Sequence, residues 1–129
     1  MVIRKTKKIT TITLLSIFTI CFVFVILRWA NIFNENIFVI TKEINSHITN
    51  FTISLMLCTL VGYLMLSLNK KYSFVIILGI FIIIANLVYE TLLPIINTID
   101  IIDAVYGIIA VILSFIYLYF INIYGFESE

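Results

Sequence analysis

Four long apolar stretches constrain what this chain can fold into more than any other feature. They run from Ile9 to Leu27, Ile48 to Leu68, Ser73 to Ile96 and Ile101 to Tyr124. None of them contains Lys or Arg. A bilayer core about 30 Å thick is spanned by roughly 20 helical residues that rise about 1.5 Å each. Because backbone amides in lipid must be hydrogen-bonded within their own segment, we expect each stretch to be a transmembrane helix.

The composition excludes an ordinary soluble domain. Of the 129 residues, 63% are hydrophobic and 12% are charged, whereas soluble domains average about 25% charged residues. The first stretch follows a basic segment, but it is too long for the apolar part of a signal peptide, and no cleavage motif follows it. We therefore expect a retained helix. The prediction is an all-α protein in which residues 1–129 form a single domain, an integral membrane bundle of four transmembrane helices.

Lys and Arg residues indicate the orientation of this bundle. Six of them flank the predicted helices on the side that holds the N-terminus: Arg4, Lys5, Lys7, Lys8, Lys70 and Lys71. The other side has only Arg28 and Lys42. Because Lys and Arg are enriched in cytoplasmic flanks, both termini are predicted to be cytoplasmic.

Polar and small side chains form one stripe along each of the last three predicted helices. The stripes comprise Asn50, Ser54 and Cys58; Gly79, Ile83, Asn86 and Glu90; and Asp103, Gly107, Ala110 and Ser114. Residues three or four positions apart share a helix face, and small residues let helices approach closely in a membrane. We expect these stripes to face the interior of the bundle, with Asn86 and Ser54 hydrogen-bonded across two helices.

Three carboxylates are predicted to lie together near the outer surface, at adjoining ends of the last two helices. Asp100 is well placed to cap the last helix, and Asp103 is either a favourable first-turn acid or part of a site. Glu90 has no capping role, since it lies near the C-terminal end of its helix. An ionisable residue inside a membrane helix favours a functional or pairing role. Together the three acids would suit a cation or an amine-bearing headgroup.

The remaining candidate residues favour ordinary structural roles. His47, the only histidine, is expected to be an interfacial side chain rather than a base or ligand, and Arg28 an interface anchor. Cys21 and Cys58 fall inside apolar stretches, so we expect neither a disulfide nor a metal site. A Gly-rich phosphate loop, a metal-ligand set and a Ser/His/Asp triad are all missing from the sequence. We therefore expect no cofactor, and an enzymatic activity is not indicated.

The segment from Tyr89 to Ala110, YETLLPIINTIDIIDAVYGIIA, resembles the last third of VanZ-like membrane proteins. That family typically has a Glu that ends helix 3 and an acidic pair that opens helix 4, matched here by Glu90, Asp100 and Asp103. Ile48 to Leu55, ITNFTISL, resembles the start of the family's second helix, with Asn50 in place of an Asp or His. The candidate ligand-binding residues are therefore Glu90, Asp100, Asp103, Asn86 and Asn50.

The resemblance implies a role in the bacterial cell envelope. The family's namesake is associated with low-level resistance to the glycopeptide teicoplanin. The expected location is the cell membrane, and the expected partners are the lipid bilayer and a lipid-linked envelope component, with no nucleic acid. Three alternatives stay open: a small four-helix transporter with an intramembrane Glu, a non-catalytic subunit of a membrane complex, and a membrane enzyme acting on a lipid-linked substrate. Four-helix multidrug transporters normally carry their Glu in helix 1, which ranks the transporter second.

The predicted orientation can be tested with single cysteines at Asn36 and at Ser128 in a Cys-free background. An impermeant thiol reagent applied to intact cells should label position 36 and leave position 128 unlabelled, because the charge asymmetry places the C-terminus inside. Labelling at position 128 but not at position 36 would invert the topology.

Overall fold

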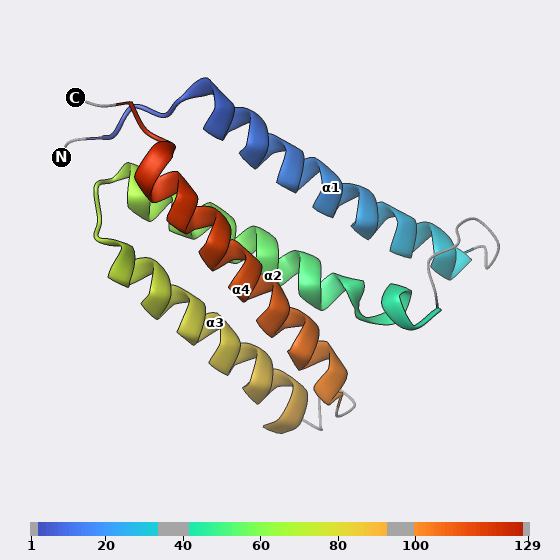
Figure 1. Cartoon of the computed structure of the whole chain (residues 1–129). Coiled ribbons are helices and arrows are strands. Elements are labelled where there is room, and N and C mark those ends of the chain that lie inside the picture. Colours follow the sequence, from blue (N-terminus) through green and yellow to red (C-terminus); the bar gives the residue numbers. More distant parts are fainter. Residues whose placement is uncertain (1–2, 34–41, 93–99, 128–129) are drawn as a thin grey trace.

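The computed structural model describes residues 3–33, 42–92 and 100–127, and this part of the chain is all-helical. Helix α1 spans Lys8–Phe33, α2 Lys42–Ser67, α3 Tyr72–Leu92 and α4 Ile101–Tyr124. Consecutive helices run antiparallel, so the two ends of the chain lie at the same end of the bundle (Figure 1). Each helix is long and apolar enough to cross a bilayer. The predicted four-helix membrane bundle is therefore confirmed.

The first two helices reach further than the apolar stretches predict. Helix α1 continues to Phe33 and α2 begins at Lys42, because polar residues beyond the hydrocarbon core can extend a helix that the apolar run has already formed. Both Arg28 and His47 consequently lie on helices. Helix α4 has the predicted bounds. The predicted end of the third helix at Ile96, and Pro94 before it, lie outside the described residues.

Helix α2 is the centre of the bundle, since it packs against each of the other three helices and most extensively against α4. Buried apolar side chains fill two layers of the interior. The first contains Leu66, Val75, Leu118 and Ile121, and the second contains Cys58, Ile82 and Val111. The predicted small-residue stripe of α4 faces this interior, because Gly107, Ala110 and Ser114 are buried. The Ser114 hydroxyl lies 3.1 Å from that of Thr59 on α2.

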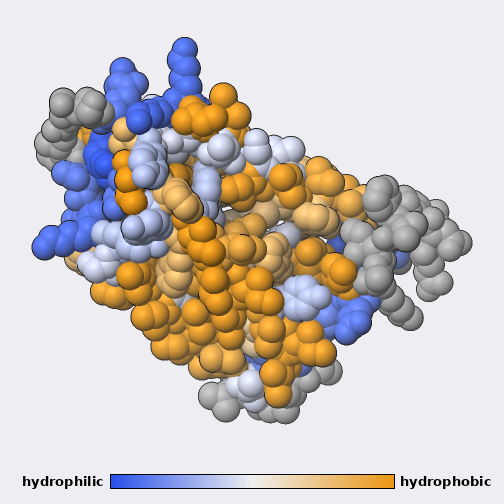
Figure 2. Space-filling view, in the orientation of Figure 1, coloured by the Kyte–Doolittle hydropathy of each residue, from blue (hydrophilic) through white to orange (hydrophobic). Residues whose placement is uncertain are grey.

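The outer surface of the bundle is apolar along most of its length. Exposed side chains include Ile77, Phe81, Ile84, Ile112 and Ile116, of which Phe81 is 68% exposed. In water such a surface would be strongly unfavourable, whereas in lipid it is the expected one. Figure 2 shows this apolar surface across the middle of the molecule and hydrophilic residues gathered toward the end that holds the termini. The chain is a multi-pass membrane protein by fold.

Segments near the two chain termini pack against each other at one end of the bundle. The segment around Thr6 pairs in an antiparallel bridge with Phe126, and the Arg4 guanidinium lies 4.0 Å from the centre of the Phe126 ring. The Arg4 amide also donates a hydrogen bond to the carbonyl of Ser67, at the end of α2. Exposed Lys70 and Lys71 follow in the turn to α3. The six cations on which the orientation prediction depends therefore gather at a single end.

Gly107 is the position at which helix packing is most easily tested. A Cβ placed there would lie 2.5 Å from the amide nitrogen of Asn86. Gly107→Leu should therefore separate α3 from α4 and lower the free energy of unfolding by about 1–3 kcal/mol, as overpacking typically does. The measurement is helical content during titration with a denaturing detergent.

The matched control is Ile108→Leu, one position along α4, where a half-buried side chain of equal size is exchanged. This variant should unfold like the unmodified protein. Equal behaviour of the two variants would show that the face assigned to the interior is incorrect.

Candidate functional site

At the end of the bundle opposite the termini, α1 ends, α2 begins, α3 ends and α4 begins (Figure 1). Polar side chains gather at this end. A hollow of about 340 Å³ opens there, which we call the distal pocket. Its lining residues are Arg28, Thr49, Asn50, Ile53, Tyr89, Glu90 and Asp103. All four helices contribute to it. The pocket is therefore a product of the tertiary structure.

Glu90 is the most deeply placed acid of the distal pocket, with 3% of its surface exposed. The Asn50 side-chain amide donates to its Oε1 over 3.1 Å. One turn earlier on α3, the Asn86 amide donates to the hydroxyl of Ser54 over 3.0 Å. A carboxyl group on a membrane-spanning helix is tolerated where it faces the bundle and is hydrogen-bonded. The predicted inward orientation of the α3 stripe and the Asn86–Ser54 hydrogen bond are both confirmed.

Asp103 pairs with the only histidine of the chain. The Nδ1 atom of His47 lies 2.8 Å from Asp103 Oδ1 and 3.6 Å from Asp100 Oδ2. The His47 side chain is 9% exposed, and its ring is tilted against that of Tyr106 at 5.4 Å between centres. His47 is thus a buried partner of two carboxylates. This differs from the interfacial role expected of it.

Asp100 serves as the N-cap of α4. It has extended backbone dihedrals, and its Oδ1 accepts a hydrogen bond from the Ile102 amide over 3.0 Å. The predicted capping role is therefore confirmed, and Asp103 follows in the first turn of the helix. Because only Oδ1 is engaged by the cap, the second oxygen of Asp100 is the one directed at His47. Asp100 can therefore cap α4 with one oxygen and face His47 with the other.

Arg28 brings a positive charge to the distal pocket. Its guanidinium donates a hydrogen bond to the hydroxyl of Thr49 on α2, which ties the end of α1 to the start of α2. A second tie joins the same two helices, since the Asn31 amide donates to Asn45 over 3.3 Å. Arg28 was expected to be an interface anchor. In the structure it also lines the distal pocket, together with Glu90 and Asp103.

The five predicted ligand-binding residues divide into three groups. Glu90, Asp103 and Asn50 line the distal pocket. Asp100 adjoins it through His47. Asn86 lies one turn deeper and lines a separate, mainly apolar hollow between α2 and α3 of about 370 Å³. The structure therefore brings four of the five together at one end of the bundle, of which the sequence predicted the three acids to be neighbours.

Two residues of this region with basic side chains, His47 and Arg28, were not among the predicted ligands. His47 precedes Asn50 by three positions, so it shares a face with Asn50 once α2 is known to begin at Lys42. The sequence prediction began this helix at Ile48, the first residue of the apolar stretch, so His47 was not placed on the same helix face as Asn50. Arg28 could not have been found in this way, because its place in the pocket depends on how α1 packs against α2.

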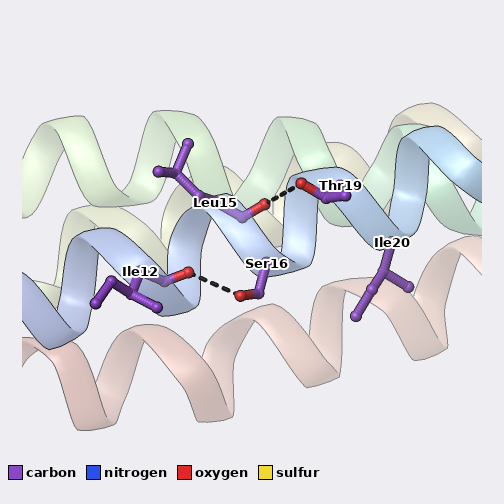
Figure 3. Close-up of a pocket in the computed structure, with 5 residues that line it drawn as sticks. All are labelled: Ile12, Leu15, Ser16, Thr19 and Ile20. Carbon is purple, nitrogen blue, oxygen red and sulfur yellow. Dashed lines mark hydrogen bonds between the residues drawn. The ribbon is translucent and has the colours of Figure 1, made fainter.

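A further hollow, on the outer face of α1, has a different character. It is lined by Ile12, Leu15, Ser16, Thr19 and Ile20. Figure 3 shows that the two hydroxyls turn back onto the helix, where Ser16 donates to the carbonyl of Ile12 and Thr19 to that of Leu15. The polar atoms are thereby satisfied locally, and an apolar surface is left for lipid. The distal pocket is the stronger candidate site.

Comparisons with known proteins found no family model, no curated protein and no solved structure that matches this chain. The resemblance to VanZ-like proteins consequently rests on the motif residues themselves. What the distal pocket does has to be argued from its geometry.

The capping role of Asp100 can be separated from any other role by two substitutions. Asp100→Ala removes the acceptor for the Ile102 amide and should destabilise the protein by about 1 kcal/mol. Asp100→Ser restores a capping oxygen and should recover most of that loss. Detergent-induced unfolding followed by circular dichroism measures both. Equal stability of the Ala variant and the unmodified protein would show that the cap contributes nothing.

Proposed function

We propose that this chain is a VanZ-like cell-envelope protein that binds the polar group of an envelope component in the distal pocket. One observation carries the proposal. A carboxyl group on a membrane-spanning helix, that of Glu90, is 3% exposed, hydrogen-bonded to Asn50 and part of the wall of a hollow at the bundle end. A purely structural polar contact does not need a hollow beside it. The VanZ-like motif includes this same residue.

The charges around the distal pocket indicate the chemistry of its ligand. Arg28 suits a carboxylate or phosphate group, since a guanidinium forms charge-assisted hydrogen bonds with planar anions. Glu90 and Asp103 suit an ammonium group. Ile53 and Tyr89 provide an apolar wall. The pocket therefore favours a group that carries an amine and an anion on a short apolar frame, presented at the predicted outer face of the membrane.

Binding is favoured over nucleophilic catalysis. The His47–Asp103 pair has the form of a base with an orienting carboxylate. Among the residues that the structure describes, however, the hydrogen bonds and ion pairs of His47 are with Asp103 and Asp100 rather than with a serine or cysteine. Both cysteines lie elsewhere in the bundle, buried and free. An attacking group activated by His47 is thus missing from the described site.

A small transporter is the second candidate, and the burial of Glu90 on α3 favours it. In that case the carboxyl would exchange its proton for substrate during transport, and substrate-driven proton flux into proteoliposomes would follow. In a binding protein, Glu90 holds the ligand without such flux. Both candidate functions use Glu90, and the measurement of substrate-driven proton flux distinguishes them.

The binding role is tested in a deletion strain under glycopeptide or other cell-wall stress. Glu90→Gln and Asp103→Asn retain shape and hydrogen-bonding capacity but lose the negative charge. Both should fold and reach the membrane at normal levels, yet fail to restore growth, because the amine of the ligand would lack its counter-charge.

Glu43→Gln is the matched control, since Glu43 is an exposed acid in the first turn of α2, away from the pocket lining. It should complement fully. Full complementation by the Glu90 and Asp103 variants at matched expression would refute the proposed function and leave these acids with a structural role.

A further inference from the structure

The side chains of His47, Asp100 and Asp103 form a compact group of potential metal ligands. One ligand atom from each lies within 4.8 Å of the others. The imidazole comes from α2, and the two carboxylates come from the start of α4, more than fifty positions further along the chain. The set is therefore more than a cluster of acids at a helix start. A buried imidazole from another helix, with its side chain 9% exposed, is directed at both carboxylates.

Two of the three distances between these atoms are compatible with the geometry of a small divalent ion. In a tetrahedral zinc site with bonds of about 2.0–2.1 Å, neighbouring ligand atoms are about 3.3 Å apart. The two separations from His47 Nδ1, 2.8 Å and 3.6 Å, lie on either side of that value. The two His47 contacts would need shifts of a few tenths of an ångström, and the two carboxylate oxygens, which lie within 4.8 Å of each other, would draw together around the ion.

A simple hydrogen bond accounts for only part of this arrangement. A proton on His47 Nδ1 explains the 2.8 Å contact with Asp103. At 3.6 Å, Asp100 Oδ2 is beyond ordinary hydrogen-bond distance from the same nitrogen. The cap of α4 requires only the other oxygen, Oδ1. A cation between the three groups would engage Oδ2 and neutralise the two neighbouring carboxylates.

The chemical nature of the donors selects the class of ion. Imidazole nitrogen suits zinc and its transition-metal neighbours, whereas calcium and magnesium prefer sites built from oxygen alone. Two carboxylates supply a charge of −2. The N-terminus of α4 carries a partial positive charge of roughly +0.5, which repels a cation. This charge is smaller in magnitude than the −2 of the two carboxylates. Asp103 also lines the distal pocket, so the group can be reached from that side.

We propose that His47 Nδ1 and the carboxylates of Asp100 and Asp103 bind one divalent metal ion of the zinc class. Three protein ligands leave a coordination position for water or for an anionic group. This inference rests on the geometry of the three side chains and does not depend on the envelope role. Asp103 is shared with the proposed ligand site. The metal site is therefore tested on His47 and Asp100, which the proposed function does not use, and the ligand site on Glu90, which is not a metal ligand.

The experiment uses the full chain, purified in detergent without a polyhistidine tag. The protein is equilibrated with Zn²⁺, freed of unbound metal, and measured by elemental analysis and by calorimetric titration. The expected result is one Zn²⁺ per chain and no comparable binding of Ca²⁺. Addition of a chelator should lower the midpoint of detergent-induced unfolding, because an ion that binds only the folded state stabilises it.

Two ligand variants complete the test. Asp100→Ser retains the capping oxygen and removes the ligand, and His47→Gln retains hydrogen-bonding capacity. Both variants should stay folded and bind Zn²⁺ more weakly. Loss of an outer-shell partner lowers metal affinity roughly 10–100-fold, and loss of a direct ligand should lower it further. Glu43→Gln is the control for surface binding and should bind like the unmodified chain. Absence of stoichiometric Zn²⁺ binding, equal binding by the ligand variants, or a preference for Ca²⁺ would each overturn the proposal.

Discussion

The requirement that every polar group inside a membrane be satisfied within the protein governs this structure. Lipid offers no hydrogen bonds, so a polar side chain on one helix has to meet a partner on another. Helix α2 supplies most of these partners, with Asn50 and Ser54 directed at α3 and Thr59 directed at α4. Asn50 donates to Glu90 and Ser54 accepts from Asn86, while Thr59 meets Ser114 deeper in the bundle. The central position of α2 follows from this series of cross-helix contacts.

These cross-helix polar contacts differ between the middle of the bundle and its distal end. Around Thr59 and Ser114 the polar atoms are small, fully buried and enclosed by apolar neighbours, which suits a structural role. Around Glu90 and Asp103 the groups are ionisable carboxyls and border a hollow. Burying a charged group costs far more than burying a hydroxyl. A purely structural role therefore explains Glu90 and Asp103 less well than it explains Thr59 and Ser114. The proposed ligand site lies at these two acids.

The distal site joins features that are usually considered separately. Asp100 stabilises the start of α4 with one oxygen and faces His47 with the other. Asp103 is a favourable first-turn acid, a partner of His47 and part of the pocket wall. Helix α4 thus begins where the site is built, and its cap sets the position of both carboxylates. A change in the cap would be transmitted directly to the geometry of the site.

Much of this architecture is contained in the sequence by itself. Four apolar stretches free of Lys and Arg are sufficient for four transmembrane helices, because length and hydrophobicity decide insertion. Helical spacing within the last three stretches is sufficient to identify their inward faces, and it correctly paired Asn86 with Ser54. The bounds of α4 and the cap at Asp100 followed from short-range signals that need no tertiary information.

Only the tertiary structure decided which side chains meet at the distal end. Arg28 and His47 lie where the apolar signal fades, so hydropathy alone left both of them outside the helices, and His47 was assigned an interfacial role. Their positions depend on how far α1 and α2 continue beyond the hydrocarbon core and on how these helices pack. The contact of His47 with Asp103 joins residues 56 positions apart. Periodicity within a helix determines which way a residue faces, but contacts of that range are determined by the packing of one helix against another.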